Sequence, residues 1–362
     1  MGKQTILPFG PQHPVLPEPV HFDLVLEDEK VVDAIPQIGF VHRGLEGLVK
    51  VRDFMQYTYV VERVCGICSF GHTMGYSELI ENLMEVEIPE RAEFLRAILH
   101  ELSRIHSHLL WAGLAADAFG FESLFMHSWR LRERVLGFFE LTTGGRVIFS
   151  FCQPGGVKQD VSNEELRELV NILDLMRIEV IELANTFLKD DSVRSRTKGI
   201  GYIDKNSALD AGLVGPFGRA SGIEDDIRLL GHGAYGKLAD FKPVISDGCD
   251  CYARMEVRLL EVLQSMDIIK ELVSKIPAGE VLVPIKGKPQ AGAIAFNRLE
   301  QPRGESYYFS ESNGSKNLER FRLRTPTAMN IPGMVLAVKG CQLSDVSMII
   351  LTIDPCISCT ER

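Results

Sequence analysis

ERVCGICSFGH, residues 62–72, and DPCISCTER, residues 354–362, each carry two cysteines three positions apart. The pairs are Cys65–Cys68 and Cys356–Cys359. Because the turn inside a Cys-x-x-Cys motif is tight, both sulfur atoms can face one ion, and thiolates select soft metals. One pair would also fit a redox-active dithiol, whereas two pairs favour a metal site. A fold that lets both pairs share one ion has to bring the two ends of the chain together.

Spacing alone leaves a structural zinc or an iron–sulfur cluster open beside a catalytic metal centre. The two cysteine pairs of a zinc ribbon lie roughly 15–20 residues apart, but 287 residues, 69–355, separate the pairs here. A folded chain of 362 residues does not need such a staple. His72 could donate a hydrogen bond to a thiolate sulfur, although a solvated histidine at a helix start would give the same pattern.

Composition narrows the class of protein. Hydrophobic residues make up 45% of the chain, as in packed globular proteins. The net charge of -10 argues against a nucleic-acid partner, which would need a basic face. We recognise no signal peptide. No apolar run approaches the roughly 18 residues that span a bilayer, so the chain is expected to reach a membrane only by docking onto a membrane protein. The remaining cysteines fit no metal spacing: Cys152, Cys249, Cys251 and Cys341.

Helical periodicity of apolar residues predicts four long helices. A capping-box pattern, Ser162 with Glu165, marks the start of the third. The predicted helices span residues 89–117, 122–143, 162–189 and 251–275.

Strand signals lie toward the two ends of the chain. Residues 21–35 are predicted to form two strands around an acidic turn, and residues 291–325 three strands broken by turns. Gly-rich loops are expected at 199–222 and 229–248. The predicted fold class is α+β and mainly helical, with a central bundle of long helices. A small antiparallel β-sheet is expected to be formed by N-terminal and C-terminal segments together.

No clean linker interrupts the chain, so residues 1–362 are predicted to form a single domain. Its expected parts are a β and loop part at 1–60, a helical core at 61–280, and a β part with the metal-binding tail at 281–362.

The two cysteine motifs resemble those of the large, catalytic subunit of nickel–iron hydrogenases. The likeness covers nearly the whole chain, and other stretches resemble the branch shared with the quinone-site subunit of respiratory complex I, whose members lack the four cysteines. The compact length and the CTER ending resemble the membrane-bound energy-converting hydrogenases of the Ech type, with a carbon-monoxide-linked hydrogenase of the same branch close to it. The shared stretches are GPQHP (10–14), FVHRGLE (40–46), RIHSHLLWAG (104–113), CDCYAR (249–254), EQPRGE (300–305) and RFRLRTPTAMN (320–330).

This resemblance implies a nickel–iron centre. All four cysteines would bind nickel, and Cys68 and Cys359 would also bridge to an iron that carries CO and cyanide. Cys65 and Cys356 would be terminal ligands, and the Cys356 thiolate would accept a proton when H2 is split. Glu18 would relay that proton, although by composition alone it could be an exposed acid between two prolines.

The resemblance also assigns residues around the centre. Arg303, after Pro302, would lie above the two metals and donate to cyanide, although it could equally be a surface arginine in a polar turn. Thr327 would donate to a second cyanide, and Asp354 would pair with Arg303. Ser107 stands where soluble hydrogenases tend to carry an aspartate.

A structural magnesium is a further expectation from the family, with Glu46 as its carboxylate ligand. Many relatives end in a histidine that ligates this ion, but the present chain has Arg362 there. Arginine cannot ligate a cation, so a direct Glu46–Arg362 pair could replace the magnesium.

Electrons would have to come from outside, since the chain has too few cysteines for an iron–sulfur cluster as well. The implied partners are a small subunit with a [4Fe–4S] cluster, ferredoxin-type electron-transfer subunits and ion-translocating membrane subunits, at the cytoplasmic face of the cell membrane. Two rival interpretations remain: a metal-free quinone-site subunit and a zinc-stapled interaction protein.

Overall fold

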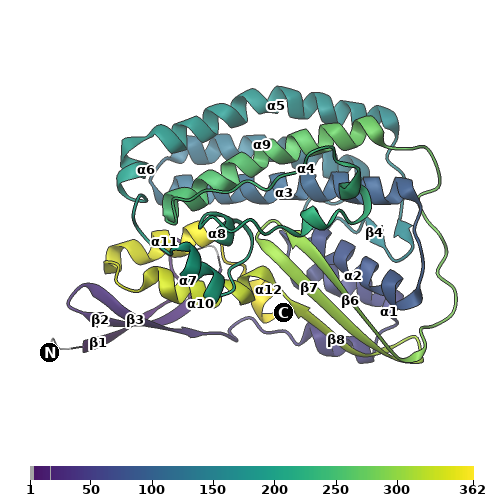
Figure 1. Cartoon of the computed structure of the whole chain (residues 1–362), viewed down its shortest axis with the longest axis horizontal. Coiled ribbons are helices and arrows are strands. Elements are labelled where there is room, and N and C mark those ends of the chain that lie inside the picture. Colours follow the sequence, from purple (N-terminus) through teal and green to yellow (C-terminus); the bar gives the residue numbers. More distant parts are fainter. Residues whose placement is uncertain (1–3, 17) are drawn as a thin grey trace.

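A computed structural model of the chain describes residues 4–16 and 18–362. Four long helices lie side by side in the upper layer of Figure 1. They are the four helices that the sequence predicts, and each begins and ends within one residue of its predicted bounds. Their bounds are Glu90–Ala118 (α3), Glu122–Thr143 (α4), Asn163–Lys189 (α5) and Cys251–Lys275 (α9).

The position of each helix explains its pattern of apolar residues. α3 packs against both α4 and α9 and is buried on nearly all sides. α5 lies on the outside, so it buries one stripe that includes Leu166, Leu169 and Leu173. The predicted capping box is confirmed, because the Ser162 hydroxyl accepts from the Glu165 amide and the Glu165 carboxylate accepts from the Ser162 amide.

Six of the strands form two separate three-stranded antiparallel sheets. The predicted α+β, mainly helical class is confirmed. The prediction of one sheet formed by both ends of the chain is wrong in this detail. Each strand pairs with its neighbour in the sequence, because a short turn joins them. The first sheet holds Gln4–Phe9 (β1), His21–Glu27 (β2) and Lys30–Gln37 (β3); the second holds Ala291–Gln301 (β6), Gly304–Asn313 (β7) and Leu318–Arg324 (β8).

The two ends of the chain do meet, but outside a common sheet. The amide of Val31 in β3 donates to the carbonyl of Cys341, and the amide of Gly340 donates to the carbonyl of Val31. A small hairpin, Cys152–Gln153 (β4) with Gly156–Val157 (β5), lies elsewhere. The prediction of a single domain stays a prediction.

Shorter helices carry the cysteine motifs. Phe54–Val61 (α1) and the 3-10 turn Glu62–Val64 (η2) lead into Ser69–Met84 (α2), which packs on β6 and β7. At the other end, Pro326–Val338 (α10) and Val346–Ile353 (α11) lead into Ile357–Glu361 (α12). The C-terminus therefore lies in the middle of the molecule in Figure 1.

The two Gly-rich stretches are only partly loops. The first contains the short helices Lys205–Asp210 (α7) and Gly215–Arg219 (α8), and the second contains the 3-10 turn Gly233–Lys237 (η4) and the end of the 3-10 turn Ile227–Leu230 (η3). A further short helix, Asp191–Ser195 (α6), precedes the first stretch. The remaining 3-10 turns are Leu45–Lys50 (η1) and Leu343–Asp345 (η5).

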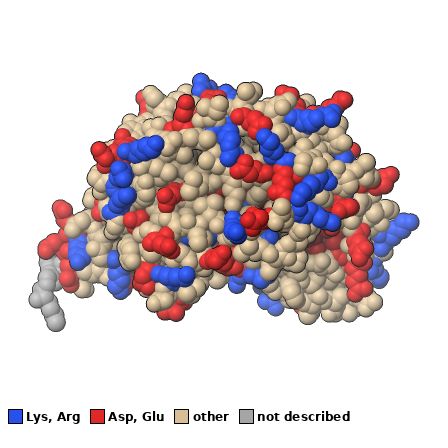
Figure 2. All heavy atoms as spheres, turned by 45° about the horizontal axis from the view of Figure 1, so that its top comes forward, with Lys and Arg blue, Asp and Glu red and all other residues tan. Residues whose placement is uncertain are grey.

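Charged side chains of both signs are interspersed over the face in Figure 2. Some pair between neighbouring helices: Arg177 of α5 lies 2.7 Å from Asp267 of α9. Exposed ion pairs of this kind contribute roughly 0–1 kcal/mol each, so apolar packing holds the bundle together. Among the described residues, no helix combines the length and the hydropathy that a membrane crossing requires.

Candidate metal centre

The four cysteines of the two motifs converge. Their Sγ atoms all lie within 4.8 Å of one another, and Cys356 Sγ is 3.3 Å from Cys65 Sγ. Each cysteine is at most 3% exposed. The structure thus confirms that the fold brings both ends of the chain to one site. Within residues 4–16 and 18–362, this is the one group of three or more metal-ligating side chains close enough to share an ion.

Helix starts place the sulfur atoms. Cys68 is the residue before α2, and Cys356 is the residue before α12. The Cys65 sulfur accepts hydrogen bonds from the amides of Ile67 at 3.3 Å and Cys68 at 3.4 Å. Amide donors at a helix start stabilise a thiolate, so the first motif is arranged to hold a negatively charged sulfur.

The donor set fits a soft metal ion. An ion with metal–sulfur bonds of about 2.3 Å can hold sulfur atoms up to about 4.6 Å apart. Hydrogen bonds from the Cys356, Cys359 and Cys68 thiols hold the pKa of Cys65 well below its usual value, whereas burial raises the pKa of Cys359. Four thiolates this close repel one another, so ionising all of them needs a cation. The geometry alone suits zinc as well as nickel and iron.

His72 lies in the first turn of α2 and is fully buried, so the alternative of a solvated histidine is wrong. Its Nε2 atom is 3.3 Å from Cys359 Sγ. Burial lowers the pKa of His72 to about 4, so the imidazole is neutral at pH 7 and carries a single N–H. The contact is the one expected for a hydrogen bond from the ring to a ligand sulfur.

Arg303 reaches the sulfur atoms from the turn between β6 and β7, where Pro302 and Arg303 are the two turn residues. Its Nη1 atom lies 3.5 Å from Cys68 Sγ and donates to the Ser107 hydroxyl at 3.2 Å. Its Nη2 atom donates to Asp354 Oδ1 at 2.8 Å. The predicted Arg303–Asp354 pair is therefore present, and the alternative of a surface arginine is wrong because the side chain is 8% exposed.

Buried side chains fix the turn that carries Arg303. Arg104 of α3 donates to the carbonyls of Glu300 at 2.7 Å and Gln301 at 3.2 Å. Gly215 allows the turn to approach α8, because a Cβ there would lie 2.3 Å from the Arg303 carbonyl oxygen. Hydrogen bonds made by fully buried groups are costly to leave unmade, so the guanidinium of Arg303 is held in one place.

Two further predicted residues meet at Cys356. The Thr327 hydroxyl accepts a hydrogen bond from the Cys356 amide at 2.9 Å and retains one proton to donate. Asp354 ends α11 in the left-handed conformation, with φ of 60°, and turns the chain toward Cys356. The predicted role of Thr327 toward a bound cyanide stays a prediction.

Glu18 reaches the second cysteine motif although it lies 338 positions before Cys356. Its Oε1 atom is 3.6 Å from Cys356 Sγ, and its Oε2 atom accepts from the amides of Ile357 and, at 2.9 Å, Ser358. Burial and the nearby Cys65 thiolate raise the pKa of Glu18 despite these amides. The side chain is half-buried, so the alternative of an exposed acid is wrong.

Arg43 was missed as a site residue, although it lies in a stretch that the resemblance covers. Its guanidinium donates to the carbonyls of Arg63 at 2.9 Å, Val64 at 2.7 Å and Ser358 at 3.0 Å. It thereby joins the residues before Cys65 to the middle of the second motif. Only a fold that brings residues 43, 63 and 358 together reveals this contact.

We expect the variant Arg43→Ala to loosen the tail that carries the second motif. Three hydrogen bonds are lost, at a cost of about 1–3 kcal/mol in local stability. Hydrogen–deuterium exchange of the amides in residues 356–362 should accelerate, and a chelator should remove bound metal faster. The control Arg52→Ala, at an exposed arginine of the next loop, should change neither rate. Equal exchange rates in Arg43→Ala and the unaltered chain would show that Arg43 does not hold the tail.

Glu46 forms the direct pair with Arg362 that the sequence suggested in place of a magnesium. Its Oε1 atom accepts from Arg362 Nε at 2.8 Å and from the Leu323 amide at 2.8 Å, and its Oε2 atom accepts from Arg322 at 2.5 Å. Burial by itself would raise the pKa of Glu46. The hydrogen bonds from Arg362 and the other donors outweigh burial, so the pKa lies below its usual value. A carboxylate surrounded by three donors does not fit a magnesium ligand.

The variant Glu46→Gln is expected to lower the free energy of unfolding by about 1 kcal/mol at pH 7. Because the folded-state pKa is lowered, the carboxylate contributes stability above its usual pKa and loses it as the pH falls through the lowered value. Urea unfolding at neutral and acid pH should therefore show the two proteins converging in acid. Glu280→Gln, at an exposed site, serves as the control; a pH-independent difference for Glu46→Gln would contradict the ion-pair account.

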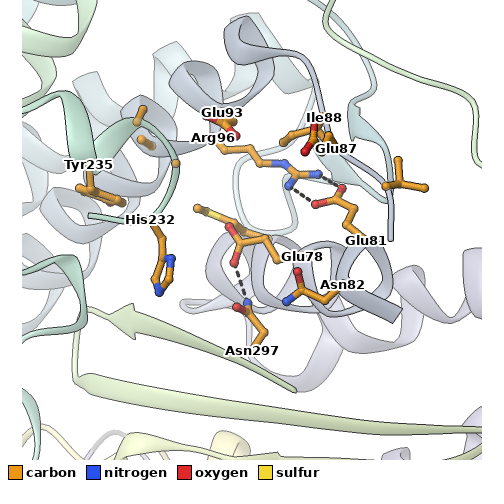
Figure 3. Close-up of a pocket in the computed structure, with 15 residues that line it drawn as sticks. Glu78, Glu81, Asn82, Glu87, Ile88, Glu93, Arg96, His232, Tyr235 and Asn297 are labelled. Atoms are coloured by element: carbon orange, nitrogen blue, oxygen red, sulfur yellow. Dashed lines mark hydrogen bonds and ion pairs between the residues drawn. The ribbon is translucent and has the colours of Figure 1, made fainter. Parts of the chain in front are cut away.

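A separate pocket of about 470 Å³ lies between α2, α3 and η4 (Figure 3). Its acidic lining includes Glu81, which pairs with Arg96 at 2.6 Å, and Glu78, which accepts from Asn297 at 2.6 Å. None of its lining residues belongs to the four-cysteine group. Sequence analysis missed this pocket because its residues come from distant segments of the chain.

Two family models match the chain. The model of the 49-kDa subunit of the respiratory-chain NADH dehydrogenase matches residues 118–291 and 285–362. The model of nickel-dependent hydrogenases matches residues 43–112, which include the first cysteine motif.

Two individual proteins and one solved structure are similar to nearly the whole chain. The chain is 35% identical to the carbon monoxide-induced hydrogenase of Rhodospirillum rubrum, over the full length of both. It is 36% identical to formate hydrogenlyase subunit 5 of Escherichia coli (strain K12), over 99% of this chain but 63% of that protein. A solved structure of the membrane-bound sulfane sulfur reductase, an archaeal respiratory membrane complex, matches with a TM-score of 0.93 and 28% identity, over 99% of this chain and 98% of that one.

Proposed function

The chain belongs to the family that contains the 49-kDa subunit of respiratory-chain NADH dehydrogenase and the related membrane-bound hydrogenase subunits, and on this premise we propose that it is the catalytic subunit of an energy-converting nickel–iron hydrogenase. The proposed reaction is the reversible cleavage of H2 into two protons and two electrons. The Ech type and the carbon-monoxide-linked type of this enzyme share the features on which the proposal rests.

One observation carries the proposal: four buried cysteine sulfurs, from two motifs at opposite ends of the chain, lie within 4.8 Å of one another. Fold alone would not select a reaction, because related folds carry different chemistry; a chain of a sulfane sulfur reductase complex has nearly the same fold. The cysteines supply the soft ligands that nickel and iron need.

The residues take the following roles under this proposal. Cys65, Cys68, Cys356 and Cys359 would hold nickel, and Cys68 and Cys359 would also hold an iron that carries CO and cyanide. When bound, the two metals supply the Lewis acidity that polarises H2. The Cys356 sulfur takes one proton, and Glu18, whose Oε1 atom is 3.6 Å away, passes it outward.

Three polar side chains orient the site. Arg303, held by Asp354 and the Ser107 hydroxyl, presents its guanidinium beside Cys68 Sγ. Thr327 retains a hydroxyl proton for a bound group. His72 donates to the Cys359 sulfur and so stabilises it as a thiolate. These groups are pre-organised donors around the place where charge develops.

The proposed partners are a small subunit with a [4Fe–4S] cluster, ferredoxin-type electron-transfer subunits and ion-translocating membrane subunits, at the cytoplasmic face of the cell membrane. The names of the relatives support a place in a membrane-bound complex. Ferredoxin is the proposed electron donor for proton reduction, and ion translocation is the proposed way in which the complex conserves the energy.

H2/D+ exchange by the purified complex tests the proposal. Cells grown with nickel should give a complex that exchanges hydrogen with solvent deuterons, and cells depleted of nickel should give an inactive one. A nickel-grown complex without exchange activity would contradict the proposal and favour the metal-free quinone-site or zinc-stapled alternatives.

A further inference from the structure

His72 has a second buried partner that the sequence does not indicate. While Nε2 faces Cys359 Sγ at 3.3 Å, the other ring nitrogen, Nδ1, lies 3.1 Å from the hydroxyl of Tyr308 in β7. Tyr308 and His72 are both 0% exposed. A continuous polar chain thus runs from a cysteine of the site to a tyrosine on the sheet behind α2.

Two glycines in α2 make this contact possible. A Cβ at Gly75 would lie 2.4 Å from Tyr308 Cε2, and a Cβ at Gly71 would lie 2.2 Å from the side-chain oxygen of Gln301. Glycine weakens a helix interior. Gly71 and Gly75 are four residues apart, so both lie on the face of α2 that meets the sheet. The helix therefore has low helix propensity at the two places where Tyr308 and Gln301 pack against its backbone.

Counting protons at the Tyr308 hydroxyl favours one direction of the chain. Gln301 Nε2 can only donate, so at 3.1 Å it donates to the Tyr308 oxygen. The single hydroxyl proton can then reach His72 Nδ1 at 3.1 Å or the Gly71 carbonyl at 3.4 Å. The nearer acceptor is Nδ1. A neutral imidazole that accepts at Nδ1 carries its proton on Nε2, which is the atom that faces the Cys359 sulfur.

We infer that Tyr308 is a positioning residue for the metal centre: its hydroxyl holds His72 in the Nε2–H tautomer, and His72 then donates to the Cys359 sulfur. The opposite tautomer would direct a nitrogen lone pair at a thiolate. This inference rests on the proposed function only in treating Cys359 as a bridging ligand; the tautomer itself is inferred from the distances among buried side chains. Tyr308 acts through His72 and does not touch the reacting atoms.

Nitrogen NMR of the complex tests the tautomer independently of metal content. The chain has nine histidines, and selective ¹⁵N labelling with a His72→Leu variant assigns the signal of His72. We expect a protonated Nε2 in the unaltered chain, and a loss of this preference in Tyr308→Phe, which keeps the ring and removes the hydroxyl. The matched control is Tyr307→Phe, because Tyr307 stacks on Phe296 and lies beside Arg324, away from His72.

Infrared spectra test whether the tautomer matters to the metal centre. Removing a hydrogen bond to a bridging thiolate puts more electron density on the metals, so the band of metal-bound CO should shift to lower frequency in Tyr308→Phe and stay in place in Tyr307→Phe. Adding Tyr308→Phe to His72→Leu should produce no further shift, because Tyr308 acts through His72.

The two measurements separate the two ways in which this account can fail. An Nε2 that is unprotonated in the unaltered chain, a tautomer that is unchanged in Tyr308→Phe, or additive infrared shifts in the double variant would each overturn the role of Tyr308. A protonated Nε2 that depends on Tyr308, in a complex without nickel or CO bands, would uphold the positioning of His72 and reject the hydrogenase proposal.

Discussion

Replacing Cys356 by serine is expected to abolish H2/D+ exchange. Serine keeps the shape of the side chain but offers a hard oxygen donor in place of the soft, polarizable sulfur that nickel selects. It also removes the group that the proposal makes the first proton acceptor. The Cys356 amide donates to Thr327 whatever the side chain is, so α12 should still form and the loss should be confined to the metal site.

A cysteine outside the site provides the comparison for this variant. Cys341→Ser changes a half-buried cysteine outside the four-sulfur group and should keep exchange activity and nickel content. Full activity in Cys356→Ser would end the assignment of this residue as a ligand. Equal losses in both variants would point to misfolding, which far-UV circular dichroism and assembly of the complex would reveal.

The variant Glu18→Gln should bind its metals and lose proton exchange. In the structure, Glu18 accepts hydrogen bonds from the amides of Ile357 and Ser358. The side-chain oxygen of glutamine can accept the same hydrogen bonds. It cannot take up and release a proton beside Cys356 Sγ. Proton transfer by a positioned side chain is typically worth about 10²–10⁴-fold in rate, so the exchange rate should fall by about 100-fold or more.

Metal analysis has to accompany this rate measurement, because a lower metal content would reduce exchange for another reason. Glu18→Asp shortens the side chain but keeps a carboxylate, and it should retain more activity than Glu18→Gln. Glu29→Gln, at an exposed acid in the turn between β2 and β3, should leave the rate unchanged. Unaltered exchange in a fully loaded Glu18→Gln complex would reject the relay.

Local patterns in the sequence were sufficient for the long helices and for each of the two cysteine pairs. The capping box at Ser162 and the apolar stripes specify α3, α4, α5 and α9 because these signals lie within one helix. The Cys-x-x-Cys motifs indicate a shared site because two sulfurs in one turn already point the same way. Both kinds of inference depend on residues that are neighbours in the sequence.

Contacts between distant segments could not be predicted in the same way. Arg43 joins residues 63, 64 and 358, and Tyr308 joins His72, only because two ends of the chain pack together. The Glu46–Arg362 pair could be suggested only because the resemblance predicted a site there.

Nickel content of the purified complex, together with its X-ray absorption spectrum, tests the central claim most directly. The account predicts one nickel ion for each copy of this chain, with sulfur as its main ligand, and the loss of that nickel in Cys356→Ser. Zinc in its place, or a complex without bound nickel, would contradict the claim that the four converging cysteines hold a hydrogen-activating centre.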